Sequence, residues 1–197
     1  MNDLDINIIK KTYSDNFSKI HLEFNQIQRR FLIDIHSINN FDLDKANISL
    51  IFIKNLHQEI LRKREVDLEY DISFNNFWKN HLNILQRNIK LINISNETKI
   101  PKETARRKVQ ELIKEKIFKK INNVINWHPE QLEKENYDKL IEKHLEMLTN
   151  FIINLAIYLK IYLKKEVVKN EIKKNFSFYW FRYLNAQIKY LSIWQDL

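Results

Sequence analysis

The chain has 197 residues, of which 44% are hydrophobic and 29% charged, with a formal net charge of +8. This length and composition support a globular fold with one large domain or two small ones, and they exclude a disordered chain. The sequence contains no glycine and no cysteine. It therefore excludes glycine-rich phosphate-binding loops, the G-x-S-x-G nucleophile elbow, disulfides and cysteine-ligated metal or iron–sulfur sites.

Apolar residues recur at helical spacing along three stretches of the first half, which are residues 12–38, 43–65 and 73–93. The first predicted helix ends at Asn39 and Asn40, because asparagine tolerates the left-handed backbone that often follows a helix. Ser73 is the expected N-cap of the third. The residues expected to face the core include Ile27, Phe31, Ile35, Leu50, Ile53, Leu56, Ile60, Leu61, Phe77, Leu82, Leu85, Ile89 and Ile92.

The next stretch, ISNETKIPKETARRKVQELIKEKIFKK, predicts two helices joined by a short turn. Ser95 is expected to cap a short helix over residues 96–98, and Lys99 with Ile100 forms the tight turn. Pro101 suits the first position of the second helix, because its fixed φ is helical and its missing N–H is not needed there. That second helix is expected to run over about residues 102–116.

A helical wheel of this second helix separates an apolar stripe from a polar face. The apolar stripe, which is expected to dock on the preceding helices, consists of Ala105, Val109, Leu112 and Ile113. The polar face contains Lys102, Glu103, Arg107, Gln110 and Lys114, with Thr104 and Arg106 on its flanks. Guanidinium, amide and ammonium groups are those that read base edges or contact phosphates in the major groove of DNA.

Positive charge is concentrated in the same region. Residues 99–120 contain nine basic and three acidic residues, a net +6, which leaves +2 for the rest of the chain. Two of the eight arginines are adjacent here, at Arg106 and Arg107. The alternative interpretation is a solvated charged face on an ordinary bundle helix. Glu103 would repel phosphates, and it is expected either to accept a hydrogen bond from cytosine or to cap the helix.

A β-hairpin is predicted directly after the basic helix. Asn122 and Asn123 stand between two β-prone runs, and asparagine accepts the positive φ of a two-residue hairpin turn. Lys119 and Lys120 lie on the first strand. Such a hairpin would form a basic wing beside the helix, placed to touch the neighbouring minor groove or DNA backbone.

The stretch from Ile94 to Phe118 resembles the helix-turn-helix core of bacterial winged-helix transcriptional regulators. The matching residues are Ile100, Pro101, Thr104, Arg106, Arg107, Leu112 and Ile117. The family often has glycine where this chain has Lys99 and Lys116, and valine in place of Ala105. The resemblance covers roughly 25–35 of the 197 residues, and it implies a winged-helix module with a DNA-reading helix and a role in transcription.

Two more helices are predicted at the C-terminal end, over residues 131–166 and 174–195. The second is rich in aromatic residues, namely Phe176, Phe178, Tyr179, Trp180, Phe181, Tyr183, Tyr190 and Trp194. They have three interpretations, which are packing into the chain's own core, a homodimer interface, and a ligand pocket.

These patterns predict a mainly α-helical bundle with a central winged helix-turn-helix module and a small β-hairpin wing. The expected organisation is a helical region at 1–72, the DNA-binding module at 73–128, and a helical pair at 129–197 that is a candidate dimerisation region. The six histidines are dispersed without metal-ligand spacing. We therefore expect no metal, no cofactor and no enzymatic activity. The acidic N-terminus and the absence of a long apolar run predict a cytoplasmic protein without a membrane segment.

The predicted function is a sequence-specific DNA-binding regulator of transcription that acts as a homodimer on double-stranded DNA. The residues expected to contact DNA are Lys102, Thr104, Arg106, Arg107, Gln110, Lys114, Lys119 and Lys120. The alternatives are a protein–protein interaction module with a winged-helix fold, and a replication or phage-type DNA-binding protein. The sequence identifies no effector ligand and no operator.

Overall fold

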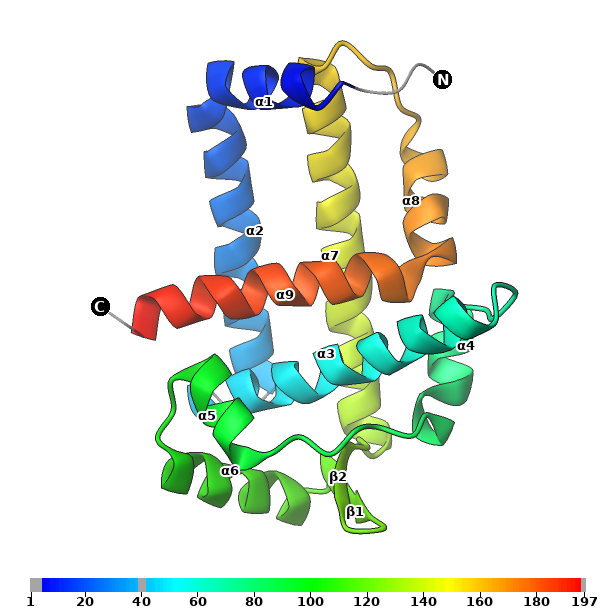
Figure 1. The fold of residues 1–197 in the computed structure, drawn as a ribbon. Helices are drawn as coiled ribbons and strands as arrows, with labels where there is room; N and C mark the ends of the chain where they lie inside the picture. Colours follow the sequence, from blue (N-terminus) through cyan, green and yellow to red (C-terminus); the bar gives the residue numbers. More distant parts are fainter. Residues whose placement is uncertain (1–4, 39–41, 196–197) are drawn as a thin grey trace.

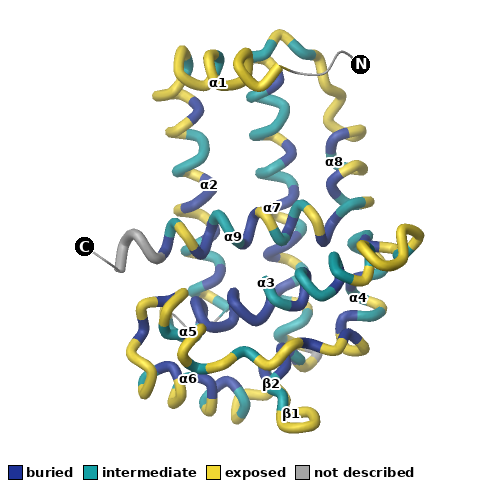
Figure 2. Tube along the Cα trace, in the orientation of Figure 1, coloured by how far each residue is buried: buried dark blue, intermediate teal, exposed yellow. Residues whose placement is uncertain are grey.

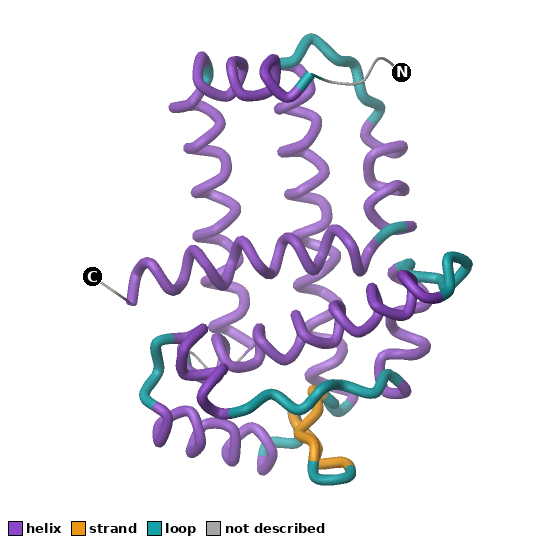
Figure 3. Tube along the Cα trace, in the orientation of Figure 1, coloured by secondary structure: helices purple, strands orange, loops and turns teal. Residues whose placement is uncertain are grey.

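The computed structural model describes residues 5–38 and 42–195. This part of the chain is mainly helical with a small two-stranded antiparallel sheet, as the sequence predicts (Figures 1 and 3). In chain order the elements are α1 (Ile6–Asp15), α2 (Phe17–Ile38), α3 (Leu43–Val66), α4 (Phe74–Asn80), the 3-10 turn η1 (His81–Asn83), α5 (Leu91–Thr98), α6 (Lys102–Lys114), β1 (Phe118–Ile121), β2 (Val124–Trp127), α7 (Gln131–Tyr158), α8 (Lys165–Lys174) and α9 (Phe176–Gln195).

The helices are arranged in two crossing sets (Figure 1). Helices α2, α7 and α8 run alongside one another, and α9 and α3 cross them. Helix α1 lies across the ends of α2 and α7. At the opposite end of the molecule, α5, α6 and the β1–β2 hairpin lie together, so the basic region predicted from the sequence occupies one pole of the fold.

Helix α3 lies at the centre of the fold. Every residue from Ala46 to Ile53 is buried, which covers more than two full turns and leaves no face of this part of the helix exposed. Helix α3 packs against α9, α6, α5 and β2 (Figure 2). The hydrophobic core around it is continuous and includes residues from all three ranges 1–72, 73–128 and 129–197.

The N-terminal helix predicted over residues 12–38 is instead two helices that meet at Asn16. The backbone of Asn16 leaves the helical region, with φ −119° and ψ 19°, and its side-chain amide donates to Thr12 O at 3.0 Å. This local hydrogen bond lets the chain turn between α1 and α2. The helix end predicted at Asn39 and Asn40 lies outside the described residues.

The prediction of a single helix over residues 73–93 is wrong. Ser73 caps α4 as expected, since its hydroxyl accepts from Asn76 N–H at 3.3 Å. The chain then leaves the helical conformation after η1 and is extended before α5. Burial alternates from Ile84 to Arg87, a period of two that belongs to extended backbone and not to a helix. Three residues expected in the core, Leu82, Leu85 and Ile92, are consequently exposed.

Gln86 explains why this segment is extended. Its side-chain amide donates to Trp127 O and accepts from Trp127 N–H, both at 3.0 Å. Gln86 and Trp127 are 3% exposed each, so the two bonds satisfy buried backbone groups on the outer edge of β2. The side chain thereby takes the place of a third strand at the base of the hairpin.

Lysine and asparagine take the left-handed backbone positions that glycine usually fills. Five described residues have positive φ, and these are Lys99, Lys116, Asn122, Asn123 and Lys160. The two asparagines form the predicted turn of the β1–β2 hairpin, and β1 and β2 pair from Phe118 with Trp127 to Ile121 with Val124. Lys99 and Lys116 are the two positions at which the family resemblance leads one to expect glycine.

The C-terminal helices differ in their bounds from those predicted over 131–166 and 174–195. Helix α7 ends at Tyr158, because Lys160 has a φ of 57° and Ile161 N–H closes the helix on Ala156 O at 2.8 Å. A separate helix, α8, follows, and α9 begins at Phe176.

Six of the aromatic residues of α9 fall into two groups. Phe176, Trp180 and Tyr183 are buried in the chain's own core. Phe178, Tyr179 and Phe181 line a groove of about 600 Å³ between α3, α8 and α9. The side chain of Trp194 lies outside the described residues, and Tyr190 is half-buried.

Replacing Gln86 with leucine is expected to lower the free energy of unfolding by about 1–3 kcal/mol, because Trp127 N–H and C=O would stay buried without partners. Urea denaturation measures the loss, and faster amide exchange at Trp127 localises it. The neighbouring Leu85 is 77% exposed, so Leu85→Ala is the control and should change stability by less than about 0.5 kcal/mol. Equal effects of the two substitutions would contradict the bracing role of Gln86.

Replacing Lys116 with glycine is expected to raise the free energy of unfolding by about 0.5–1 kcal/mol, since a residue without Cβ adopts positive φ without steric cost. Lys116 also forms an ion pair with Glu130, and both side chains are more than half exposed. Losing such an exposed ion pair costs little stability, so it does not cancel the expected gain. Gln110→Gly, at an exposed position in the interior of α6, is the control and should destabilise by about 1 kcal/mol. Thermal unfolding of both variants measures whether each substitution raises or lowers stability. A loss of stability in Lys116→Gly would contradict a steric cost of the positive φ at this position.

Candidate nucleic-acid interface

The turn between α5 and α6 is held by two hydroxyl groups. Ser95 lies inside α5 and is not the N-cap predicted from the sequence; its hydroxyl donates to Ile100 O at 2.7 Å. Thr98 Oγ1 accepts from Ile100 N–H at 3.3 Å and donates to Ile94 O at 2.7 Å. Lys99, with φ 60°, makes the turn itself, and Ile100 is buried. The angle between the two helices is therefore fixed by side-chain bonds as well as by packing.

Helix α6 sits on this turn with the faces that the sequence predicts. Pro101 is its N-cap, one position earlier than expected, and its carbonyl accepts from Ala105 N–H at 2.9 Å. Ala105, Val109 and Leu112 are buried against α3 and α5, whereas Ile113 is half-buried. The polar face is exposed at Lys102, Glu103, Arg106, Arg107, Gln110 and Lys114, and Thr104 is half-buried on its flank.

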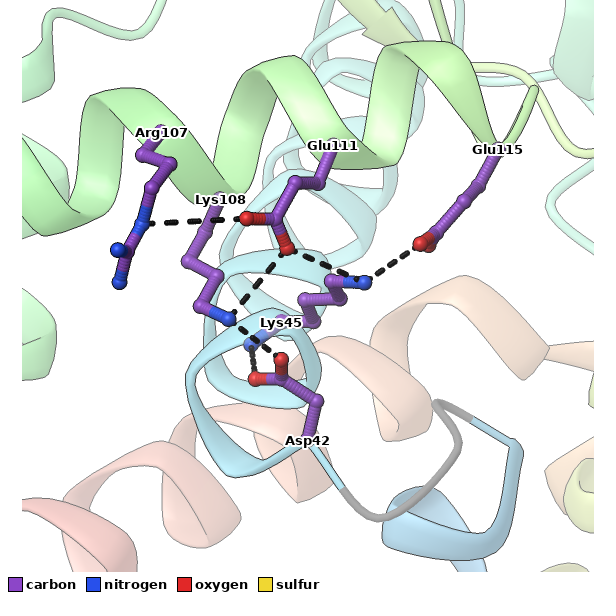
Figure 4. Close-up of polar contacts among 6 residues, drawn as sticks. All are labelled: Asp42, Lys45, Arg107, Lys108, Glu111 and Glu115. Carbon is purple, nitrogen blue, oxygen red and sulfur yellow. Dashed lines mark hydrogen bonds and ion pairs between the residues drawn. The ribbon is translucent and has the colours of Figure 1, made fainter.

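A network of charged side chains joins α6 to the N-terminal end of α3 (Figure 4). Lys108 Nζ lies 2.7 Å from Asp42 Oδ2 and 3.4 Å from Glu111 Oε2. Lys45 Nζ lies 3.3 Å from Glu111 Oε2 and 2.5 Å from Glu115 Oε1. The side chains of Lys45 and Lys108 are only 12% and 16% exposed. Lys108 therefore belongs to the attachment of α6 and not to its outward face.

The network shifts the pKa values of its members. Burial by itself raises the pKa of the Asp42 carboxyl, but the hydrogen bonds from Lys108 and from Lys45 N–H outweigh burial and lower the pKa below 3.8. The hydrogen bond to Asp42 in turn raises the pKa of Lys108. Asp42 also caps α3, since its Oδ1 accepts from Lys45 N–H at 3.0 Å.

Both arginines of α6 are paired with carboxylates on their own helix. Arg106 Nε donates to Glu103 Oε2 at 2.9 Å, so Glu103 neither caps the helix by its side chain nor stands free. Arg107 Nε lies 3.8 Å from Glu111 Oε1. Both arginine side chains are more than 60% exposed, so they can reach a partner outside the chain.

Four of the cationic residues that the sequence predicts to contact DNA form no ion pair with another described residue, and these are Lys102, Lys114, Lys119 and Lys120. All four are exposed. The hairpin follows α6 directly, and Ile117 N–H, just before β1, donates to Leu112 O of α6 at 3.0 Å. The structure thus brings together on one pole the eight residues that the sequence predicts, with Thr104 the least exposed of them. Among the helices and strands that the structure describes, Figure 1 shows none over the outer side of α6 and the hairpin.

Neither a known protein family, nor a curated protein, nor a solved structure matches this chain. Among the described helices, none is long and apolar enough to span a bilayer. The described residues also contain no cluster of three or more histidine, aspartate or glutamate side chains placed to bind a metal ion.

A second polar cluster lies inside the helical body. His144 Nε2 is 3.0 Å from Asp34 Oδ2, and its Nδ1 is 2.9 Å from the Tyr183 hydroxyl. Burial lowers the pKa of His144, although its hydrogen bond to the Asp34 carboxylate opposes this. His144 has no exposed surface, and its two ring nitrogens connect α7 to α2 through Asp34 and to α9 through Tyr183.

Sequence reasoning missed the residues that position α6. Asp42, Lys45 and Glu111 are ordinary charged residues in the sequence, and nothing in their spacing shows that α3 and α6 will meet. The signal that was available is local. Asp42 precedes a predicted helix by one residue, as an N-cap does, and Lys108 stands three residues before Glu111. Gln86 carries no comparable signal.

Replacing Lys108 with methionine is expected to lower the free energy of unfolding at neutral pH by about 1–2 kcal/mol, between the values for exposed and buried ion pairs. The pKa of Asp42 in the folded state is below its unfolded value, so the pair stabilises the fold above pH 3.8 and this contribution is lost as the pH falls further. The difference between wild type and variant should therefore shrink in acid.

Chemical denaturation at several pH values between 7 and 3 measures this difference. Lys114→Met, on the exposed face of the same helix, is the control and should remain close to wild type throughout. A difference between wild type and Lys108→Met that stays constant down to pH 3 would show that Asp42 is not its source.

Proposed function

We propose that this protein binds double-stranded DNA through α6 and the β1–β2 hairpin, as a sequence-specific regulator of transcription. The observation that carries the proposal is the separation of the two faces of α6. Its apolar residues are buried against α3 and α5, whereas its arginines, glutamine and outer lysines are exposed beside two lysines of the hairpin. An exposed helix of this composition fits the width and the donor–acceptor pattern of the major groove.

The arrangement of the neighbouring elements supports the winged-helix resemblance. Helices α3, α5 and α6 pack against one another, and the hairpin follows α6 directly. In this interpretation α3 is the first helix of the module, although the sequence suggested residues 73–93 for that role. The segment braced by Gln86 then lies between the first and second helices, against the edge of the hairpin.

The homodimer expected from the sequence stays a prediction. Three of the aromatic residues that suggested a dimer interface, Phe176, Trp180 and Tyr183, are buried in the core of a single chain. The aromatic residues of α9 that remain for a dimer interface are those that line the groove, Phe178, Tyr179 and Phe181. A dimer would place two recognition helices on two half-sites.

Two substitutions test the DNA-binding proposal. A duplex sequence is first selected from random DNA in the presence of heparin, and its affinity is measured at two or more salt concentrations. Arg107→Ala is expected to weaken binding to the selected duplex by about 1–3 kcal/mol and to relax its sequence preference. Lys119→Ala is expected to weaken binding to all duplexes and to reduce the salt slope by about one.

Lys174→Ala is the matched control, because Lys174 is an exposed lysine on α8 that forms no ion pair with another described residue. This substitution removes one positive charge at a site distant from α6, so the affinity for the selected duplex and the salt slope should both stay unchanged. Binding that is equal in all three variants, or absent from the wild type, would refute the proposal. Salt-independent affinity for a protein in place of DNA would favour the interaction-module alternative.

A further inference from the structure

The end of the molecule opposite α6 is formed by α1 and by the loop that joins α7 to α8 (Figure 1). Both segments are largely exposed (Figure 2), and no residue of α1 is buried. The large apolar side chains exposed at this end, which together we call the distal surface, are Ile6, Ile8, Ile9, Tyr13, Phe17, Ile157, Tyr162 and Leu163. Exposed apolar residues gathered at one end of a protein mark a site of contact with a membrane or another molecule.

The loop contributes only apolar residues and lysines. The sequence from Ile157 to Lys165, which covers the end of α7 and the loop, is IYLKIYLKK. Tyr162 is 87% exposed. It stands between Lys160 and Lys164, which are exposed and form no ion pair with another described residue. Tyrosine has an apolar ring and a polar hydroxyl, and lysine has an apolar stem and a cationic tip. Both therefore suit the boundary between lipid headgroups and acyl chains.

Helix α1 has the pattern of a helix that lies along a bilayer surface. Its ten residues are too few to cross a bilayer. On a helical wheel its four large apolar residues share one side. Lys10 stands at the border of that side and Lys11 on the polar side, and both are exposed. Such a helix places its apolar side chains in the boundary region while its lysines reach the headgroups.

The charge of the distal surface favours an anionic partner. Residues 5–19 and 157–166 contain six lysines and three acidic residues. One of the three, Asp5, caps α1 by accepting from Asn7 N–H at 2.9 Å. Two copies of the chain that met through this surface would bring their lysines together, and the loop has no carboxylate to pair with them. A bilayer with anionic lipids offers negative charge to the lysines and an apolar layer to the side chains between them.

We propose that the distal surface docks on the surface of a bilayer that contains anionic lipids. Helix α1 lies along the bilayer, Tyr162 and Leu163 enter the boundary between headgroups and acyl chains, and the loop lysines contact lipid phosphates. Because α6 and the hairpin lie at the opposite end of the molecule (Figure 1), a bilayer docked here leaves them uncovered. Bilayer docking is thus independent of DNA binding by α6.

Binding to lipid vesicles tests the proposal. The full chain is sedimented with vesicles of phosphatidylcholine alone, and with vesicles of phosphatidylcholine and phosphatidylglycerol in equal amounts. We expect binding only to the second kind, and weaker binding as the salt concentration rises, because salt screens the lysines from the anionic lipids. Tyr162→Ser is expected to lower the partition coefficient about three- to tenfold, since the aromatic ring is lost from the boundary region.

A matched pair of double variants separates the distal surface from the opposite end, which also carries exposed lysines. Lys160→Asn with Lys164→Asn is expected to lower the partition coefficient about 10- to 30-fold. Lys99→Asn with Lys90→Asn is the control and should leave vesicle binding unchanged.

The four lysines of these variants occupy equivalent positions. Lys99 has a φ of 60° and Lys160 has a φ of 57°, and asparagine tolerates such a backbone. Lys90 and Lys164 are the N-caps of α5 and α8. All four are exposed, so each double variant removes the same charge from the same kinds of position. Circular dichroism of each variant checks that a loss of binding is not a loss of fold.

A dye attached to a single cysteine shows which end of the molecule enters the bilayer. Because the chain contains no cysteine, Tyr162→Cys and Leu85→Cys each provide one site for the polarity-sensitive dye nitrobenzoxadiazole. Leu85 is 77% exposed and lies between η1 and α5. On addition of the anionic vesicles, the emission of the dye at position 162 is expected to shift to the blue, and the emission of the dye at position 85 should not change.

Three outcomes would overturn the proposal. The first is a wild type that does not bind the anionic vesicles, and the second is an equal loss of binding in the two double variants or a dye that shifts at position 85 and not at position 162. The third is a dimer that forms without vesicles and that Tyr162→Ser dissociates, measured by analytical ultracentrifugation, which would assign the distal surface to a second copy of the chain. None of these outcomes bears on DNA binding by α6, which the duplex titration measures separately.

Discussion

The burial of α3 on every side is the constraint on which the rest of the structure depends. A helix with eight consecutive buried residues needs neighbours all round, and α9, α5, α6 and β2 supply them. Some polar residues of α3 are also buried. Burial lowers the pKa of His57 to about 3, so its neutral ring packs as an aromatic group, stacked 4.7 Å from Phe77. The position of α6 follows from this packing, because α6 is one of the covers.

The attachment of α6 to α3 sorts the basic residues of the region into two kinds. Lys108 faces inward and forms part of the joint, as does Lys45 from the other side. Lys102, Lys114 and the hairpin lysines face outward. A count of charge along the sequence treats these alike and so overstates the charge that is free for a partner. What the partner meets is set by packing, since the same helix must bury one face before it can present the other.

The parts of the fold that local chemistry determines could be predicted from the sequence, and the parts that tertiary contacts determine could not. The asparagine turn of the hairpin and the two faces of α6 are examples of the first kind, because each depends on residues close together in the chain. The segment after Asn83 is an example of the second. Its apolar residues fit a helix of period 3.6, but Gln86 forms its bonds with Trp127, 41 residues further on, and this contact holds it extended.

The absence of glycine places a particular demand on the C-terminal ends of α5 and α6. Lys99 and Lys116, which follow these two helices, both adopt a φ of 60°, so each has a steric cost that the surrounding bonds must offset. At the C-terminal end of α6 those bonds are Lys116 N–H to Ile113 O, Ile117 N–H to Leu112 O, and His128 N–H to Ile117 O. The last joins the base of the hairpin to the end of α6. The direction of the hairpin relative to the helix is therefore fixed by backbone hydrogen bonds, and the two basic surfaces stay in a constant relation to each other.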